Sequence, residues 1–249
     1  MAHEADGVHL VLSRRDEATL VTITGVLQLS SYPEVRDGLL KSAAEPSEGL
    51  VADIGGTHIV DASLATVFAV VARRIGDWPG LPFAVVSARP EHQAMFVGRP
   101  LGQFVPLHSD FASAVRSFDH PVLCRAKQTL VRSEHAAAAA RRLAEAVCEE
   151  WKVPELLDEA RLIATELVEN VIRHTASVPL LRLELRQGVL TVAVTDDDPR
   201  PAERQASAGS GLGLHMVART AKVWGCSRTW SGGKVVWAVL VRPGGGAVR

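Results

Sequence analysis

The sequence is short of cysteine and of net charge, and each shortage excludes a class of protein. Its three cysteines, Cys124, Cys148 and Cys226, are odd in number and form no Cys-x-x-Cys or His-rich cluster. A disulfide framework and a zinc site are therefore excluded, and we expect reduced thiols. The net charge of −1 over 249 residues lacks the strongly basic balance typical of nucleic-acid binding. We expect no direct nucleic-acid partner.

Long apolar runs and a secretory leader are also missing. The longest apolar run, residues 62–72, is too short to cross a bilayer. The first ten residues, MAHEADGVHL, lack the basic and then apolar pattern of a signal peptide. We therefore expect a cytoplasmic protein with no membrane partner.

The sequence does have the apolar content of a folded protein, at 47% apolar and 22% charged residues. Its length allows two ordinary domains. The stretch SFDHPVLCR, with a proline and no clear period, predicts a break between them. We expect a first domain over residues 1–117, a linker over 118–124 and a second domain over 125–243. Residues 1–117 carry 9 basic and 13 acidic residues against 18 and 15 in the rest, so the two halves have opposite charges that allow docking.

The first half alternates strand-like and helix-like segments, which predicts helices packed on a sheet in an α/β layer. The second half predicts an α+β arrangement, with helices on one face of a mostly antiparallel sheet. The expected segments of the first half are strands at 19–27, 49–54 and 81–87 and helices at 31–43, 61–76 and 110–118. Those of the second are helices at 133–151 (capped by Ser133), 154–174 and 209–225 and strands at 180–186, 189–194 and 234–241.

The segment ATELVENVIRHT lies on the second predicted helix of the second half. At 3.6 residues per turn, one apolar stripe faces the core: Ala160, Ile163, Ala164, Leu167, Val168 and Val171. Glu166 and Asn170 are four residues apart and lie side by side off that stripe. A carboxylate and an amide at the edge of a core could hold a metal ion and orient an attacking group. The alternative is an ordinary solvated helix face.

Two further segments have the residue types of a nucleotide site. In VAVTDDDPRP a strand ends at Asp196, whose carboxylate could accept a hydrogen bond from an amino group; the alternative is an acidic turn. In GSGLGLHMV, Gly209, Gly211 and Gly213 open a helix, as phosphate-binding turns do; the alternative is a flexible loop. The segment is neither a Rossmann fingerprint nor a Walker A motif, because no strand leads into the glycines and Gly-Lys-Ser/Thr is missing.

Taken in order, ATELVENVIRHT, the strand ending in Asp196, GSGLGLHMVARTAKVWG and GKVVWAVL resemble the GHKL ATPase superfamily, and most closely its anti-sigma factor serine kinases. The resemblance covers residues 125–241 and implies ATP and Mg²⁺ as cofactors. It implies that Asn170 coordinates Mg²⁺, that Glu166 is the general base, and that Asp196 binds the adenine amino group. The three glycines would then approach the phosphates beside a lid at 195–208. One departure is Val235, where related sequences often carry a threonine that hydrogen-bonds near the adenine.

The first half resembles a STAS domain, the fold of anti-anti-sigma factors, through the order of its elements and VADIGGTHIVDASLATVFAVVARR. That family carries Asp-Ser-Ser-Gly-Leu at a helix start, with one serine phosphorylated by the cognate kinase. Here the motif reads Asp-Ala-Ser-Leu-Ala, so Ser63 is the phosphoacceptor candidate and Leu64 replaces the glycine. The alternative is that Ser63 merely caps the helix.

Together the resemblances imply a partner-switching regulator: a protein-serine kinase and anti-sigma factor acting on a STAS-domain serine. The implied partners are a sigma factor, a STAS-domain protein, or both. The resemblance does not decide whether the protein also forms a homodimer. One alternative is a non-catalytic ATP-binding regulator with a degenerate STAS domain. Another is a histidine-kinase-like fragment, for which His135 lacks the usual flanking residues.

Overall fold

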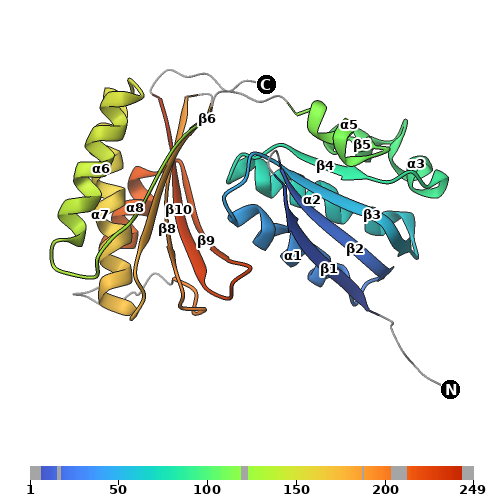
Figure 1. Ribbon diagram of the computed structural model, residues 1–249, viewed down its shortest axis with the longest axis horizontal. Helices are drawn as coiled ribbons and strands as arrows, with labels where there is room; N and C mark the ends of the chain where they lie inside the picture. The colour runs from blue at the N-terminus through green and yellow to red at the C-terminus, as the bar shows by residue number, and fades with distance from the viewer. Residues whose placement is uncertain (1–6, 16–17, 119–122, 187, 203–211, 243–249) are drawn as a thin grey trace. The chain divides into compact units, whose positions relative to one another are not determined.

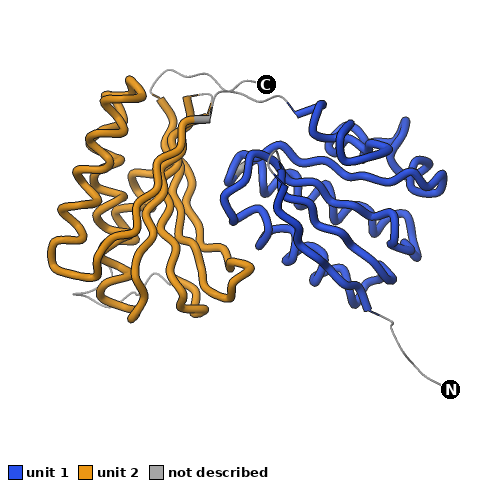
Figure 2. Tube along the Cα trace, in the orientation of Figure 1, with its two compact units in different colours: residues 1–120 blue, residues 121–249 orange. Residues whose placement is uncertain are grey.

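The computed structural model describes residues 7–15, 18–118, 123–186, 188–202 and 212–242. The chain divides into two compact units, Met1–His120 and Pro121–Arg249 (Figure 2). Each unit has its own sheet of five strands and its own buried core. The units are described one at a time below.

The sheet of the first unit has the strand order β1-β2-β3-β4-β5, with an antiparallel β1–β2 pair followed by parallel pairs. The parallel pairs require crossover connections, which is why helices alternate with these strands. The strands are β1 (Val8–Arg14), β2 (Thr19–Leu27), β3 (Leu50–Ile59), β4 (Phe83–Val86) and β5 (Leu107–His108). The helices are α1 (Tyr32–Ala44), η1 (Ala62–Ala65), α2 (Thr66–Asp77), α3 (Pro90–Phe96), α4 (Pro100–Phe104) and α5 (Phe111–Arg116).

Helices cover both faces of this sheet, because successive strand residues point to opposite sides. Val21 and Ile23 of β2 belong to the larger core, which includes residues of α1 and α2. Leu20, the residue before Val21, points to the opposite face and belongs to a smaller core with Ala114 of α5. The predicted α/β layer is confirmed. Strands β1 and β5 and helices α3 and α4 were not predicted, since they are short or lack a clear period.

The second unit has the strand order β6-β7-β8-β10-β9, and all of these neighbours are antiparallel. The strands are β6 (Leu123–Thr129), β7 (Leu180–Arg186), β8 (Val189–Asp196), β9 (Val223–Arg228) and β10 (Lys234–Val241). The helices are α6 (Ala136–Glu150), η2 (Pro154–Leu156), α7 (Leu157–His174) and α8 (Leu212–Thr220). Figure 1 shows α6, α7 and α8 on one side of this sheet.

The core of the second unit lies between these helices and one face of the sheet. The buried residues of α7 are the six predicted ones: Ala160, Ile163, Ala164, Leu167, Val168 and Val171. They share a core with alternate residues of the strands, such as Leu181 and Leu183 of β7 and Val236 and Ala238 of β10. The predicted layer of helices on an antiparallel sheet is confirmed.

Two helix boundaries in the second unit were predicted wrongly. The helix expected to reach Gly225 ends at Thr220, and Trp224 lies on β9 opposite Ala238. Apolar residues keep a helical spacing as far as Trp224. The segment nevertheless forms a strand, because pairing with β10 outweighs helix propensity there. Ser133 does not cap α6 either: the N-cap residue is His135, whose backbone amide donates to the Ser133 hydroxyl.

Candidate functional site

Helix α7 places Glu166 and Asn170 at the edge of the core. Both side chains are half-buried, one turn apart, beside the buried stripe. Burial raises the pKa of Glu166, the nearby charge of Glu169 raises it further, and Arg173 opposes the shift. A carboxylate that is held partly away from water in this way is a better proton acceptor than an exposed one.

The start of α8 lies against Glu166. A methyl group at Gly213 would meet the end of the Glu166 side chain, so the glycine lets the Glu166 carboxylate lie where it does, against the first turn of α8. Leu214 and Val217 of α8 are buried in the same core as α7, which holds the helix in place. The structure thus brings Glu166 and Gly213 together. Gly209 and Gly211, and the lid residues 203–208, lie outside the described residues.

Asp196, the last residue of β8, has a completely buried side chain. Its Oδ1 accepts a hydrogen bond of 2.8 Å from Lys234 Nζ and another of 2.8 Å from the Asp198 backbone amide. The other oxygen, Oδ2, is equally buried, and no described residue donates to it. A buried acceptor without a donor is costly, which makes this oxygen a candidate acceptor for the donor of a ligand.

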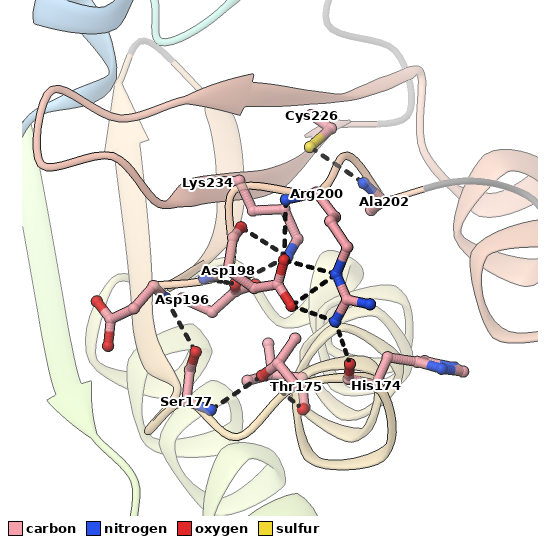
Figure 3. Close-up of polar contacts among 11 residues, drawn as sticks. His174, Thr175, Ser177, Asp196, Asp198, Arg200, Ala202, Cys226 and Lys234 are labelled. Carbon is pink, nitrogen blue, oxygen red and sulfur yellow. Dashed lines mark hydrogen bonds and ion pairs between the residues drawn. The ribbon is translucent and has the colours of Figure 1, made fainter.

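The segment after Asp196 is tied to the end of α7 (Figure 3). Asp198 pairs with Arg200, and this hydrogen-bonded partner holds the pKa of the Asp198 carboxyl far below its usual value. Arg200 also donates to the backbone oxygen of His174, at 3.4 Å. The Asp197 amide donates to the Ser177 hydroxyl at 3.1 Å. These contacts fix the acidic segment beside the helix that carries Glu166 and Asn170.

Val235 does not face Asp196, although a threonine there was expected to lie near the adenine. Lys234, Val236 and Ala238 of β10 are on the face of the sheet that the helices cover. Val235 lies between Lys234 and Val236 in the sequence and therefore points to the opposite face. The residue of β10 that reaches the Asp196 carboxylate is therefore Lys234. The substitution of threonine by Val235 does not alter this side of the site.

Sequence reasoning missed the role of Lys234. Asp196 and Lys234 are 38 residues apart and become direct neighbours only through the β8–β10 pairing. A signal was nevertheless present, because a lysine that opens an apolar strand and points into the core needs a buried carboxylate as partner. Gly233 allows the approach: a side chain there would collide with the backbone of Asp196 and Asp197.

Ser63 of the first unit lies on the surface, in η1. The cap of this helix is Asp61, whose carboxylate accepts hydrogen bonds from both the backbone amide and the side chain of Ser63. These bonds lower the pKa of Asp61. The alternative in which Ser63 caps the helix is therefore wrong, and its hydroxyl lies at the surface beside a carboxylate.

Within the described residues, no group of three His, Cys, Asp or Glu side chains could hold a metal ion. Mg²⁺ in nucleotide sites takes only one or two protein ligands beside phosphate oxygens, so Asn170 alone fits that kind of site. None of the described helices is both long and apolar enough to span a membrane.

The comparison with protein families finds a match in the second unit. Residues 131–240 match the family described as the histidine kinase-like ATPase domain. No curated protein matches the chain. This match covers α6, α7, α8 and four strands, and so includes Glu166, Asn170, Asp196 and Gly213.

Several solved structures are similar to parts of the chain at low identity. An anti-sigma factor antagonist from Mycobacterium paratuberculosis is 18% identical, with 45% of this chain and 94% of that one covered and a TM-score of 0.40. The anti-sigma factor antagonist SpoIIAA in its unphosphorylated form is 13% identical, with 43% and 95% covered and a TM-score of 0.36. The RsbU and RsbW domains of a Mycobacterium tuberculosis protein are 18% identical, with 48% and 33% covered and a TM-score of 0.37.

The family match and the topology agree with the resemblance found in the sequence. Three helices lie on an antiparallel sheet, with the acidic strand end and the glycine-led helix both beside α7. The fold class predicted for the two halves is confirmed, and the second unit is similar to the histidine kinase-like ATPase domains.

Proposed function

We propose that the second unit binds Mg-ATP and transfers its terminal phosphoryl group to a serine of a STAS-like domain. The observation that carries this proposal is the contact between Glu166 and the first turn of α8. It places a candidate proton acceptor beside a helix N-terminus, where phosphates bind well. Glu166, Asn170, Asp196 and Gly213 keep the roles that the resemblance implies, as do Gly209 and Gly211.

Binding of the nucleotide would use both ends of this site. The free Oδ2 of Asp196 would accept a hydrogen bond from the adenine amino group. The backbone amides at the start of α8 would face the phosphates. Asn170 would hold Mg²⁺, which when bound neutralises part of the phosphate charge.

In the transfer step the serine hydroxyl oxygen forms a bond to the γ-phosphorus, and the bond from that phosphorus to the β–γ bridging oxygen breaks. ADP leaves with the electron pair of that bond. The hydroxyl proton passes to the Glu166 carboxylate, whose raised pKa suits it to accept a proton. The products are ADP, phosphoserine and the proton held by Glu166, which passes to water, so atoms and charge balance.

The first acceptor to test is Ser63, because its hydroxyl is exposed. A phosphate there adds negative charge next to Asp61 and would change which partner the first unit binds. On this proposal the protein is a partner-switching regulator whose partners are a sigma factor, a STAS-domain protein, or both. The acceptor serine would lie in this chain or in a separate STAS-domain chain.

Intact mass spectrometry after incubation with Mg-ATP tests the proposal, with Glu166→Ala and Ser63→Ala alongside. We expect one added phosphate in the wild type and none in either variant, while both variants still bind ATP. A phosphate that persists in Glu166→Ala contradicts the role of that residue. Failure of the wild type to bind ATP contradicts the proposal as a whole.

One observation favours a second candidate, a non-catalytic regulator that senses ATP. The Asp61 carboxylate already accepts hydrogen bonds from Ser63, and its negative charge would repel an incoming phosphoryl group. The same experiment separates the two candidates, when a separate STAS-domain protein is also offered as acceptor. ATP binding with no phosphate on either protein would favour the second candidate.

A further inference from the structure

Lys234 is the one strongly buried lysine side chain in the site, and the proposed function assigns it no role. Its side chain is 4% exposed, and its ammonium group lies 2.8 Å from Asp196 Oδ1. A second bond of 3.1 Å runs to the backbone oxygen of Asp198. A lysine is rarely buried this deeply unless a specific partner offsets the loss of hydration.

The bonds to Asp196 are unevenly divided between its two oxygens. Oδ1 receives both donors, Lys234 Nζ and the Asp198 amide, while Oδ2 receives none from any described residue. This asymmetry fixes the rotation of the carboxylate and leaves one defined oxygen for a ligand. A carboxylate oxygen accepts hydrogen bonds, so the ligand group that meets Oδ2 must be a donor.

We propose that Lys234 is a positioning residue that sets the base specificity of the site: by holding Asp196 as a fixed acceptor, it selects a purine with a 6-amino group against one with a 6-oxo group. This inference rests on the proposed binding of ATP. An adenine amino group donates to Oδ2. The 6-oxo group of hypoxanthine or guanine has no donor there and places a second oxygen against a buried negative charge, which is unfavourable.

Pairing across the sheet explains why this residue can act so specifically. Lys234 stands directly opposite Asp196 in the β8–β10 register, so the distance between them is set by backbone hydrogen bonds. Gly233 lets β10 approach the backbone of Asp196 and Asp197. The loop beyond is held by Arg200 and Ser177. Movement of the Asp196 carboxylate is therefore restricted from three sides.

The test compares the binding of ATP and inosine triphosphate, which differ at position 6 of the purine, by titration calorimetry with the full chain. For the wild type we expect ATP to bind about 10- to 100-fold more tightly, as the loss of a hydrogen bond to a charged group implies. For Lys234→Met we expect this ratio to fall close to one. Lys234→Arg keeps the positive charge and should restore most of the ratio. Lys127→Met, an exposed lysine on β6, is the matched control and should keep the wild-type ratio.

The ratio separates a role in specificity from a purely structural one. If Lys234→Met lowers the affinity for both nucleotides by the same factor, the lysine only supports the fold, and the inference is wrong. If the wild type binds both nucleotides equally well, Asp196 does not read the amino group, and the inference fails while nucleotide binding stands. If the wild type binds neither, the proposed function itself fails and this inference falls with it.

A second variant covers the case in which Lys234→Met does not fold, as circular dichroism would reveal. Lys234→Gln has no charge but keeps an amide donor for Asp196 and the Asp198 backbone oxygen. We expect it to fold and to give an intermediate ratio of ATP to inosine triphosphate affinity. A ratio equal to that of the wild type would contradict the need for a positive charge.

Discussion

The two units place their candidate residues in opposite settings. In the second unit Asp196 is buried, and its partner Lys234 is 38 residues away on another strand. In the first unit Asp61 is exposed, and its partner Ser63 is two residues away. A buried long-range pair is rigid and depends on the whole fold, as a binding pocket requires. An exposed local pair is accessible and tolerant of change, as a modification site requires.

Substitution of Gly233 should break the buried arrangement and have the largest effect. In Gly233→Ala the new methyl group meets the backbone of Asp196 and Asp197, which cannot move aside cheaply. We expect the free energy of unfolding to fall by about 1–3 kcal/mol, as in other overpacked sites, with loss of ATP binding. Urea unfolding followed by tryptophan fluorescence measures this, since four of the five tryptophans lie in the second unit.

Gly213→Ala is the matched control for that substitution. There the methyl group meets the end of the Glu166 side chain, which can rotate away. Because alanine favours a helix over glycine by up to about 1 kcal/mol, stability should be unchanged or slightly higher. Phosphate transfer should fall, because Glu166 has moved. An equal loss of stability in both variants would contradict this comparison, because it would mean that a methyl group costs as much against the Glu166 side chain as against the backbone of Asp196 and Asp197.

The pH dependence of phosphate transfer sharpens the comparison within the second unit. Burial and the charge of Glu169 raise the pKa of Glu166, so the rate should decline on the acid side at a higher pH than an ordinary glutamate would give. In Glu169→Gln this decline should shift to lower pH, and in Arg173→Gln to higher pH, because Arg173 opposes the shift. Initial rates measured from pH 4 to 8 give the three profiles. Profiles that coincide would exclude Glu166 as the titrating base.

The same shift makes a statement about stability. The folded state binds this proton more tightly than the unfolded chain does, since the pKa of Glu166 is raised above its ordinary value of 4.5. Its contribution to stability is therefore fully present below about pH 4.5 and is lost as the pH rises through the folded pKa. Glu166→Gln should remove this dependence, which a comparison of urea midpoints at two pH values would show.

Substitution of Asp61 should have the smallest effect. Asp61→Asn keeps a capping side chain, because asparagine caps helices as well as aspartate does, so the melting temperature should not change. Removal of the negative charge beside Ser63 should raise the rate of phosphate incorporation, by about fivefold at most. Mass spectrometry with time gives the rate. A lower rate in Asp61→Asn would mean that this carboxylate assists the transfer rather than opposing it.

Local patterns predicted those parts of the molecule that depend on neighbouring residues. The buried stripe of α7 follows from helical spacing alone, and all six of its residues were predicted. The strands β7 and β8 follow from alternation across a short turn. The predicted boundary at Gly225 failed because pairing with β10, and not local preference, decides the structure of that segment. At the other helix, the Ser133 hydroxyl accepts from the His135 amide, which is too early in the chain to cap α6.

The candidate site shows the same limit. The positions of Glu166, Asn170 and Asp196 on their elements could be predicted, since each lies at a recognisable place on a helix or strand. The partnership of Asp196 with Lys234 could not, because it depends on strand order: β10 inserts between β8 and β9. Arg200 and Ser177 were missed for the same reason, as their partners lie in other segments.

The late position of Lys234 in the chain has a consequence for synthesis. When a ribosome has released the chain through α8, Glu166, Asp196 and Gly213 have all emerged, but the strand that carries Lys234 has not. Until β10 docks between its neighbours, the Asp196 carboxylate lacks the ammonium group that holds it. A nascent chain at that stage should not discriminate between nucleotides. On this view, nucleotide recognition begins only when the last strand of the sheet is in place.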